Sequence, residues 1–228
     1  AAEAQREAPR CVPDRMTPEY SRSVAASRMA LAGLAYLVML ALATGLDAVS
    51  GRLLPVEHPA PWLALGEHAT AVSLRLGPAL ALGVILSTRW LVERVAWARR
   101  LREDLRPLLH GATSGQLLAL AIFSGVAEEW LFRGALQPLV GLVPATLLFG
   151  LAHLGPGRRF VAWALWAAAV GLALGAIFEA TGSLAGVLLA HVAINAVNLR
   201  LVADHHGRLE DRPSTPAPRL VTDRVRAS

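Results

Sequence analysis

Long apolar runs separated by short polar intervals dominate the chain. A helix that crosses the hydrocarbon core of a bilayer needs about 20 predominantly apolar residues, and six runs approach or reach this length. They occupy residues 29–46, 71–91, 115–139, 142–154, 160–180 and 184–199. The pattern predicts an all-α fold, a polytopic membrane helix bundle with about six transmembrane helices.

The segments outside the apolar runs define the domain organisation. Residues 1–27 form a polar N-terminal leader, and residues 28–200 hold the predicted transmembrane domain, with a catalytic core expected in residues 115–200. Residues 201–228 are polar and contain several prolines, so we expect a disordered cytoplasmic tail. The arginine-rich segment 89–106 is expected to be either an interfacial helix or a basic connector.

Composition and charge support a membrane protein. Only 17% of residues are charged and 54% are hydrophobic, with a mean hydropathy of +0.46, whereas soluble domains carry about 25% charged residues. All 22 basic residues are arginines, and they alternate between the intervals in a way that places both termini in the cytoplasm by the positive-inside rule. No interleaved basic and aromatic face is present, so no nucleic-acid partner is expected. The single cysteine, Cys11, excludes an internal disulfide.

Three formal charges interrupt the third apolar run, in the stretch "GVAEEWLFRGAL". A charge at the centre of a spanning helix costs about 2.5–3.5 kcal/mol, so uncompensated charges would oppose insertion. Glu129 and Arg133 are four residues apart, share a helix face and can pair. Glu128 lies about 100° further round the helix, so we expect its carboxylate to point elsewhere.

Two further apolar runs contain polar side chains in pairs of residues with helical spacing. Phe149 and His153 are four residues apart in the fourth run, and His191 and Asn195 are four apart in the sixth. Taken singly, an intramembrane His or Asn typically serves helix packing. With a helical rise of about 1.5 Å per residue, however, these side chains and Glu128 come to a similar depth near the midplane. The agreement predicts a shared polar cavity.

This set of groups favours hydrolytic chemistry. A glutamate beside an imidazole can act as a general base and activate water. An imidazole N–H and an asparagine amide can donate to a developing oxyanion. Ser124 has no base at hydrogen-bonding spacing in the sequence, so a serine nucleophile is not favoured. The residues therefore indicate amide hydrolysis without a covalent intermediate.

Glycines at two places predict close helix packing. The stretches "GLALG" at residues 171–175 and "GSLAG" at residues 182–186 place small residues four apart, a spacing that lets helix backbones approach each other.

The three polar motifs occur in an order that resembles a known family. "EEWLFR" matches EExxxR, "FGLAH" matches FxxxH and "HVAIN" matches HxxxN. The sequence resembles the CAAX protease and bacteriocin-processing family, the Rce1-like, glutamic-type intramembrane endopeptidases, over about residues 115–200. Among bacterial members it resembles the group called myxosortases, which process C-terminal anchors of exported proteins.

The resemblance implies a role for each motif residue. Glu128 would activate the water with assistance from His153, and His191 and Asn195 would form the oxyanion hole. The supporting residues would be Glu129 and Arg133, which orient the site, and Phe149, which shapes the cavity. The implied enzyme needs no cofactor and acts near the C-terminus of a membrane-anchored or lipidated protein. We expect it in the bilayer of a bacterial inner membrane.

Two other functions stay open at this point. Glu128, His153 and His191 are also a plausible set of three zinc ligands, although the sequence lacks HExxH. A non-catalytic membrane protein, such as a transporter or an immunity or scaffold protein, could use the same residues as a buried polar network.

Overall fold

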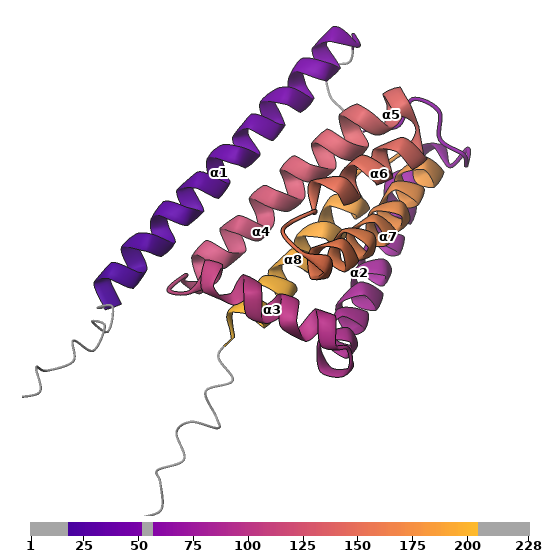
Figure 1. The fold of residues 1–228 in the computed structure, drawn as a ribbon. Helices are drawn as coiled ribbons and strands as arrows, with labels where there is room; N and C mark the ends of the chain where they lie inside the picture. The colour runs from indigo at the N-terminus through magenta and orange to yellow at the C-terminus, as the bar shows by residue number, and fades with distance from the viewer. Residues whose placement is uncertain (1–17, 52–56, 205–228) are drawn as a thin grey trace, which may run out of the picture.

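The computed structural model describes residues 18–51 and 57–204, and these residues fold as a helical bundle with a single isolated β-bridge between Glu57 and Ser183 (Figure 1). The elements in chain order are α1 (Pro18–Val49), η1 (Gly66–His68), α2 (Ala69–Arg94), α3 (Ala96–Leu109), α4 (Ser114–Glu129), η2 (Trp130–Leu136), α5 (Gln137–Val140), α6 (Leu142–Ala152), α7 (Arg158–Thr181) and α8 (Ala185–Ala203). The predicted all-α membrane bundle is confirmed.

Five helical segments are long and apolar enough to cross a membrane. They are Ser23–Val49, Gly66–Arg94, Ser114–Val140, Arg158–Thr181 and Ala185–Ala203. The fourth predicted run instead forms α6, whose 11 residues extend about 16 Å. This length is short of a bilayer core of about 30 Å. The chain is therefore an integral membrane protein in which one predicted span is a short helix.

Helix α1 starts earlier than the predicted first span, because Pro18 begins it inside the segment expected to be a polar leader. Helix α8 continues to Ala203, past the predicted start of the tail. The rest of the leader, with Cys11, and residues 205–228 lie outside the described residues.

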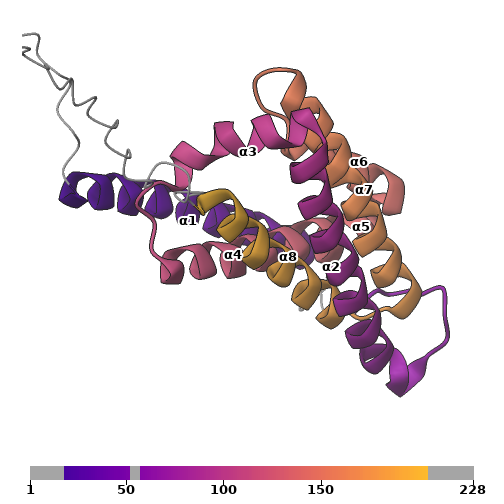
Figure 2. The same cartoon turned by 90° about the horizontal axis from the view of Figure 1, so that it is seen from below.

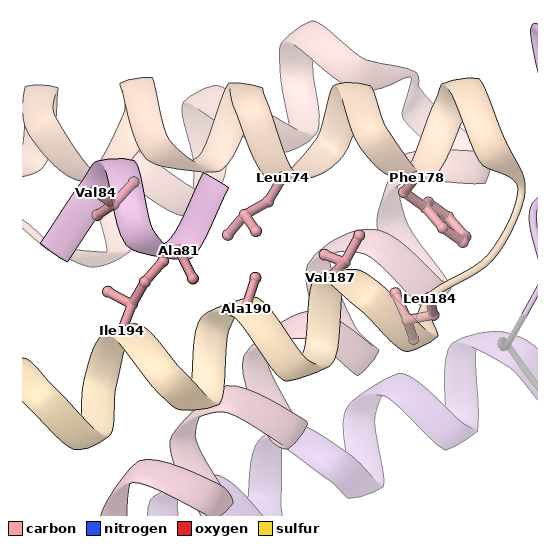
Figure 3. Close-up of a cluster of buried hydrophobic side chains, with 8 residues drawn as sticks. All are labelled: Ala81, Val84, Leu174, Phe178, Leu184, Val187, Ala190 and Ile194. Carbon is pink, nitrogen blue, oxygen red and sulfur yellow. The ribbon is translucent and has the colours of Figure 1, made fainter. Parts of the chain in front are cut away.

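Helix α8 lies at the centre of the bundle between α2 and α4 (Figures 1 and 2). Its apolar contacts with α2 and α7 form the main hydrophobic cluster (Figure 3). The members of this cluster are Ala81, Val84, Leu174, Phe178, Leu184, Val187, Ala190 and Ile194. The site residues on α8 are thus carried by a helix that packs against α2, α4 and α7.

Small residues let α2 and α8 touch through their backbones. A Cβ added at Gly186 would overlap the backbone of Ser73, and one added at Gly77 would overlap the backbone of Gly186. The Ser73 hydroxyl donates to the carbonyl of Ser183 (2.9 Å) and accepts from the amide of Gly186 (3.1 Å). The close packing predicted for residues 182–186 is therefore present, and a buried serine reinforces it.

Helix α3 runs across one end of the bundle (Figures 1 and 2). The Arg102 guanidinium donates to the carbonyls of Leu201 (2.7 Å) and Asp204 (3.0 Å), and so caps the C-terminus of α8. Asp104 pairs with Arg159 at 2.7 Å. Segment 89–106 is helical from Ala96 onward, and polar contacts tie this helix to α7 and α8, whereas its position relative to the membrane interface stays a prediction.

A substitution at the α2–α8 contact tests this packing. We expect Gly186→Ala to destabilise the protein by about 1–3 kcal/mol, because the added methyl group has no space and the two helices must separate. Thermal unfolding in detergent measures the effect. The matched control is Gly83→Ala on α2, where a Cβ meets nothing within 4 Å, and it should unfold at or above the wild-type temperature. Equal unfolding temperatures for the two variants would contradict the close contact.

Candidate active site

The site begins where α4 changes into a π-helix. Thr113 and Gln116 form a capping box that fixes the start of α4. The α-helix ends at Glu129, and the seven residues of η2 continue it as a wider π-helix. π-Helical segments are rare in proteins, and those that occur are often found at functional sites. Here the change of helix type falls directly after the two adjacent glutamates.

The Glu129 carboxylate joins two helices. It is fully buried, accepts from Nη1 of Arg133 at 2.9 Å, and its same oxygen, Oε1, lies 2.5 Å from Nδ1 of His191. The second guanidinium nitrogen of Arg133 donates to the carbonyl of Gly171 (3.0 Å). The predicted Glu129–Arg133 pair is thus present, and the structure adds His191 and α7 to it.

Glu128 points into a cavity, away from this buried pair. Its Oε2 lies 3.8 Å from Nε2 of His153 and 3.7 Å from Nε2 of His191. Both distances exceed the range of a direct hydrogen bond. Within the described residues, this oxygen has no hydrogen-bond partner. The oxygen is also buried, so a water molecule or a substrate group that reached it would supply its missing hydrogen bond.

The partners of the two imidazoles define their tautomers. Nδ1 of His153 lies 2.8 Å from the carbonyl of Phe149, which only accepts, so this nitrogen carries a proton. Nδ1 of His191 faces the Glu129 carboxylate and carries a proton for the same reason. Both Nε2 atoms consequently face Glu128, and either one can exchange a proton with that carboxylate or with a bound water.

Aromatic rings hold the imidazoles in place. The Phe149 ring lies 4.7 Å from the ring of His153 and 6.0 Å from that of His191, and it packs edge-on against Phe132. The Arg133 guanidinium lies 4.2 Å from the centre of the Phe149 ring, a cation–π contact. The structure thus places Phe149 between the buried ion pair and the cavity.

Asn195 lies one turn after His191 on α8. Its Nδ2 donates to Oγ of Ser124 (2.9 Å), and the Ser124 hydroxyl donates to the carbonyl of Ala121 (3.2 Å). These bonds commit Ser124 to an amide and a carbonyl, and none of them links it to an imidazole. The partnership with Asn195 gives Ser124 a role that the sequence did not indicate.

Two largely apolar cavities meet at these groups. One, of ≈ 220 Å³, is bounded by α2, α3, α6, α7 and α8, and its wall includes Phe149 and His191. The other, of ≈ 450 Å³, is bounded by α1, α3, α4, α6 and α8, and its wall includes Glu128. His153 and Asn195 line both cavities. The polar groups therefore lie where two largely apolar cavities adjoin.

A polar ladder continues from the site along α7. Gln137 donates to the carbonyl of Gly175 (3.0 Å) and to Oε1 of Glu179 (3.1 Å), and Oε2 of Glu179 lies 3.2 Å from His58. A Cβ at Gly175 would crowd the Gln137 amide. Gly171 and Gly175 therefore leave space for the polar side chains of Arg133 and Gln137. The spacing of the two glycines in the sequence is the same as that of glycines at a helix–helix contact, so spacing alone could not show this function. The sequence analysis did not predict this ladder, although Glu179, a charged residue inside an apolar run, could have indicated it.

The described part of the chain was also searched for side chains that could together bind a metal ion. No group of three His, Cys, Asp or Glu side chains there is arranged to hold a metal ion. Glu128, His153 and His191, the ligands that a zinc site would use, lie close together, with Nε2 of each histidine facing the Glu128 carboxylate.

Adjacent glutamates provide a matched test of the two roles. We expect Glu129→Gln to destabilise the protein by about 3–5 kcal/mol, because it leaves the buried Arg133 without its counter-charge. Glu128→Gln should unfold close to the wild-type temperature, because that carboxylate faces a cavity. Thermal unfolding in detergent compares them. Similar destabilisation by both changes would show that Glu128 also serves the fold.

Comparison with known proteins agrees with this geometry. Residues 111–197 match the family described as Type II CAAX prenyl endopeptidase Rce1-like. The chain is also 37% identical over 83 residues to the uncharacterized protein YpbD of Bacillus subtilis (strain 168), covering 36% of this chain and 42% of that relative. No solved structure matches the chain.

All seven candidate site residues lie inside the matched range, whereas α1 and α2 lie outside it. The three motifs, the apolar helices that carry them and the family match agree with one another. Over residues 111–197, the chain is therefore similar to the Rce1-like family of CAAX prenyl endopeptidases.

Proposed function

We propose that the protein is a glutamic-type intramembrane endopeptidase. The observation that carries the proposal is the position of the Glu128 carboxylate. It lies within 4 Å of Nε2 of both His153 and His191, at the boundary of two apolar cavities. The match to a family of endopeptidases over the same residues supports it.

Water activation is assigned to Glu128 and His153. A water bound at the unpaired Oε2 of Glu128 loses a proton to the carboxylate as its oxygen attacks the scissile carbonyl carbon. Nε2 of His153, 3.8 Å away, faces the same oxygen and can help to hold that proton. The proton then moves to the departing amine, so that the glutamate returns to its starting state when the peptide bond breaks.

The developing oxyanion is assigned to His191 and Asn195. The Nδ1–H of His191 is directed at Glu129, and this contact stabilises a protonated imidazole that can donate through Nε2. One Asn195 N–H bonds to Ser124, which leaves the second N–H for the substrate. Donors fixed before the substrate arrives need little reorganisation during the reaction.

The apolar cavities support a membrane-embedded or lipidated substrate. We infer that the scissile bond lies near the C-terminus of a membrane-anchored protein, and that the peptide is extended at the site because a helix hides its carbonyls. In this proposal the enzyme resembles the myxosortases, lies in a bacterial inner membrane and has both termini in the cytoplasm, in line with its arginine distribution.

Cleavage by the purified full chain in liposomes tests the proposal. The probes are C-terminal anchor peptides, with and without a lipid group, and mass spectrometry identifies the products. We expect cleavage by the wild type in the presence of a chelator, and a loss of at least about 100-fold for Glu128→Gln, because a general base contributes roughly 10²–10⁴-fold. Glu67→Gln, an identical change at an exposed residue of η1, should leave the rate unchanged.

Two outcomes would contradict this assignment. Cleavage that a chelator abolishes and zinc restores would indicate a metalloprotease. A Glu128→Gln variant that matches the wild type in cleavage or in the native cellular function would indicate that Glu128 belongs to a non-catalytic polar network.

A further inference from the structure

A second pair of polar side chains lies in the smaller cavity, on α2 and α8. Val84 of α2 and Ile194 of α8 lie at the same end of the main apolar cluster (Figure 3). Thr88 and Asn198 follow one turn later on the two helices, and both line the ≈ 220 Å³ cavity. Both residues lie outside the range 111–197 that matches the Rce1-like family. The family match therefore assigns them no role.

Each of these side chains has a buried polar atom without a protein partner. Oγ1 of Thr88 and Oδ1 of Asn198 are buried and make no hydrogen bond to any of the described residues. In contrast, the hydroxyls of Thr44 and Thr181 donate to the carbonyl four residues earlier in their own helices, at 2.8 and 2.7 Å. Buried polar atoms in proteins are nearly always paired, so two unpaired ones in the wall of one cavity point to a ligand that bonds to them.

The chemistry of the two atoms favours a peptide group as this ligand. The Thr88 hydroxyl can donate, whereas the amide oxygen of Asn198 can only accept. A peptide group offers a carbonyl to the first and an N–H to the second. An acyl or isoprenoid chain offers neither, and would leave both polar atoms unpaired among apolar groups. The pair therefore favours polypeptide over a lipid chain as the occupant of this cavity.

We propose that Thr88 and Asn198 form a subsite that binds the backbone of the peptide substrate close to the scissile bond. This inference rests on the proposed function, in which Asn195 donates to the oxyanion. Asn195 and Asn198 line the same cavity, and they are about 4.5 Å apart along the axis of α8. An extended peptide advances about 3.3 Å per residue. The peptide group bound at the subsite is thus about one or two residues from the scissile bond.

The remaining wall of the cavity suits the side chains of such a peptide. It is largely apolar and includes Trp97, Trp166 and Leu174. Hydrogen bonds to the main chain provide affinity for any sequence, whereas the pockets around them select side chains. Apolar peptides of unrelated sequence should therefore all use the subsite.

Binding to the full chain carrying Glu128→Gln tests the subsite without cleavage. The sequence contains two asparagines, Asn195 and Asn198, so selective 15N-asparagine labelling in detergent reports on two side-chain amides, and Asn195→Ala assigns them. We expect apolar anchor peptides of unrelated sequence to shift the Asn198 signal. Thr88→Val should raise the Kd of these peptides about two- to tenfold, the effect of one hydrogen bond. It should leave the Kd of farnesol, a lipid chain without a peptide, unchanged.

Two controls separate binding from folding. Thr88→Val removes an unpaired polar atom and keeps the shape of the side chain, so it should unfold at or above the wild-type temperature. Thr44→Val is the same change at a hydroxyl that is bonded to its own helix and lines neither cavity, and it should leave the peptide Kd unchanged. A lower unfolding temperature for Thr88→Val would show that water already satisfies this hydroxyl, and would contradict the inference.

Kinetics extend the test to cleavage. Thr88→Val should raise KM about two- to tenfold with kcat little changed, because a bond made equally in the ground state and the transition state affects binding alone. A peptide in which an ester replaces the amide bound by Asn198 lacks the N–H donor, and its KM in the wild type should rise similarly. The same replacement should have no effect in Asn198→Leu, because the acceptor is already absent.

The outcomes separate the two proposals. If Glu128→Gln abolishes cleavage but Thr88→Val changes neither the Kd nor the KM of the peptides, the subsite is wrong and the protease assignment stands. If no peptide is cleaved, the Asn198 titration alone decides. A shift that needs more peptide in Thr88→Val supports the subsite, and a signal that no peptide moves overturns it. An equal rise in the Kd of farnesol would also overturn it, because the pair would then not distinguish polypeptide from lipid.

Discussion

The buried carboxylate of Glu129 is the interaction on which the rest of the site depends. A guanidinium cannot lie in an apolar bundle without a counter-charge, and Glu129 supplies it to Arg133 while also binding His191. One oxygen atom thereby ties η2 to α8. Because Arg133 in turn binds the backbone of α7, the charged group that is costly to bury also connects three segments of the fold.

The division of labour between the adjacent glutamates follows from this. Glu129 is fully buried and bonded to Arg133 and His191. Glu128, the preceding residue, lies about 100° away around the helix and faces a cavity. The same histidine contacts both carboxylates through its two ring nitrogens. The structural pair can therefore set the orientation of His191, while Oε2 of the neighbouring carboxylate has no hydrogen-bond partner among the described residues.

Glycines and short helices give these groups their room. Gly171 and Gly175 leave space on α7 for Arg133 and Gln137, and the early end of α6 puts His153 at a helix terminus where its ring turns back to the Phe149 carbonyl. A full-length fourth helix would have carried His153 on a regular helical face. The short α6 instead leaves a cavity lined by residues of several helices.

The sequence by itself determined the class of fold and the identity of the motif residues. Long apolar runs leave a chain few alternatives to membrane helices, because every backbone polar group must be satisfied within the bilayer. Charges and imidazoles in such runs are conspicuous, since their cost demands a partner or a function. Spacing also predicted the Glu129–Arg133 pair, because two side chains four residues apart remain neighbours despite the change to a π-helix.

Only the tertiary structure decided which groups meet across helices. Local spacing carries no information on the contact of Asn195 with Ser124, on the Gln137–Glu179 pair, or on the position of Tyr36 beside the site. These contacts depend on how far each helix rotates and how closely it approaches its neighbours. Rotation and approach are set by the small residues at the crossings and by the shortened α6, and both act through packing between segments that are distant in the chain.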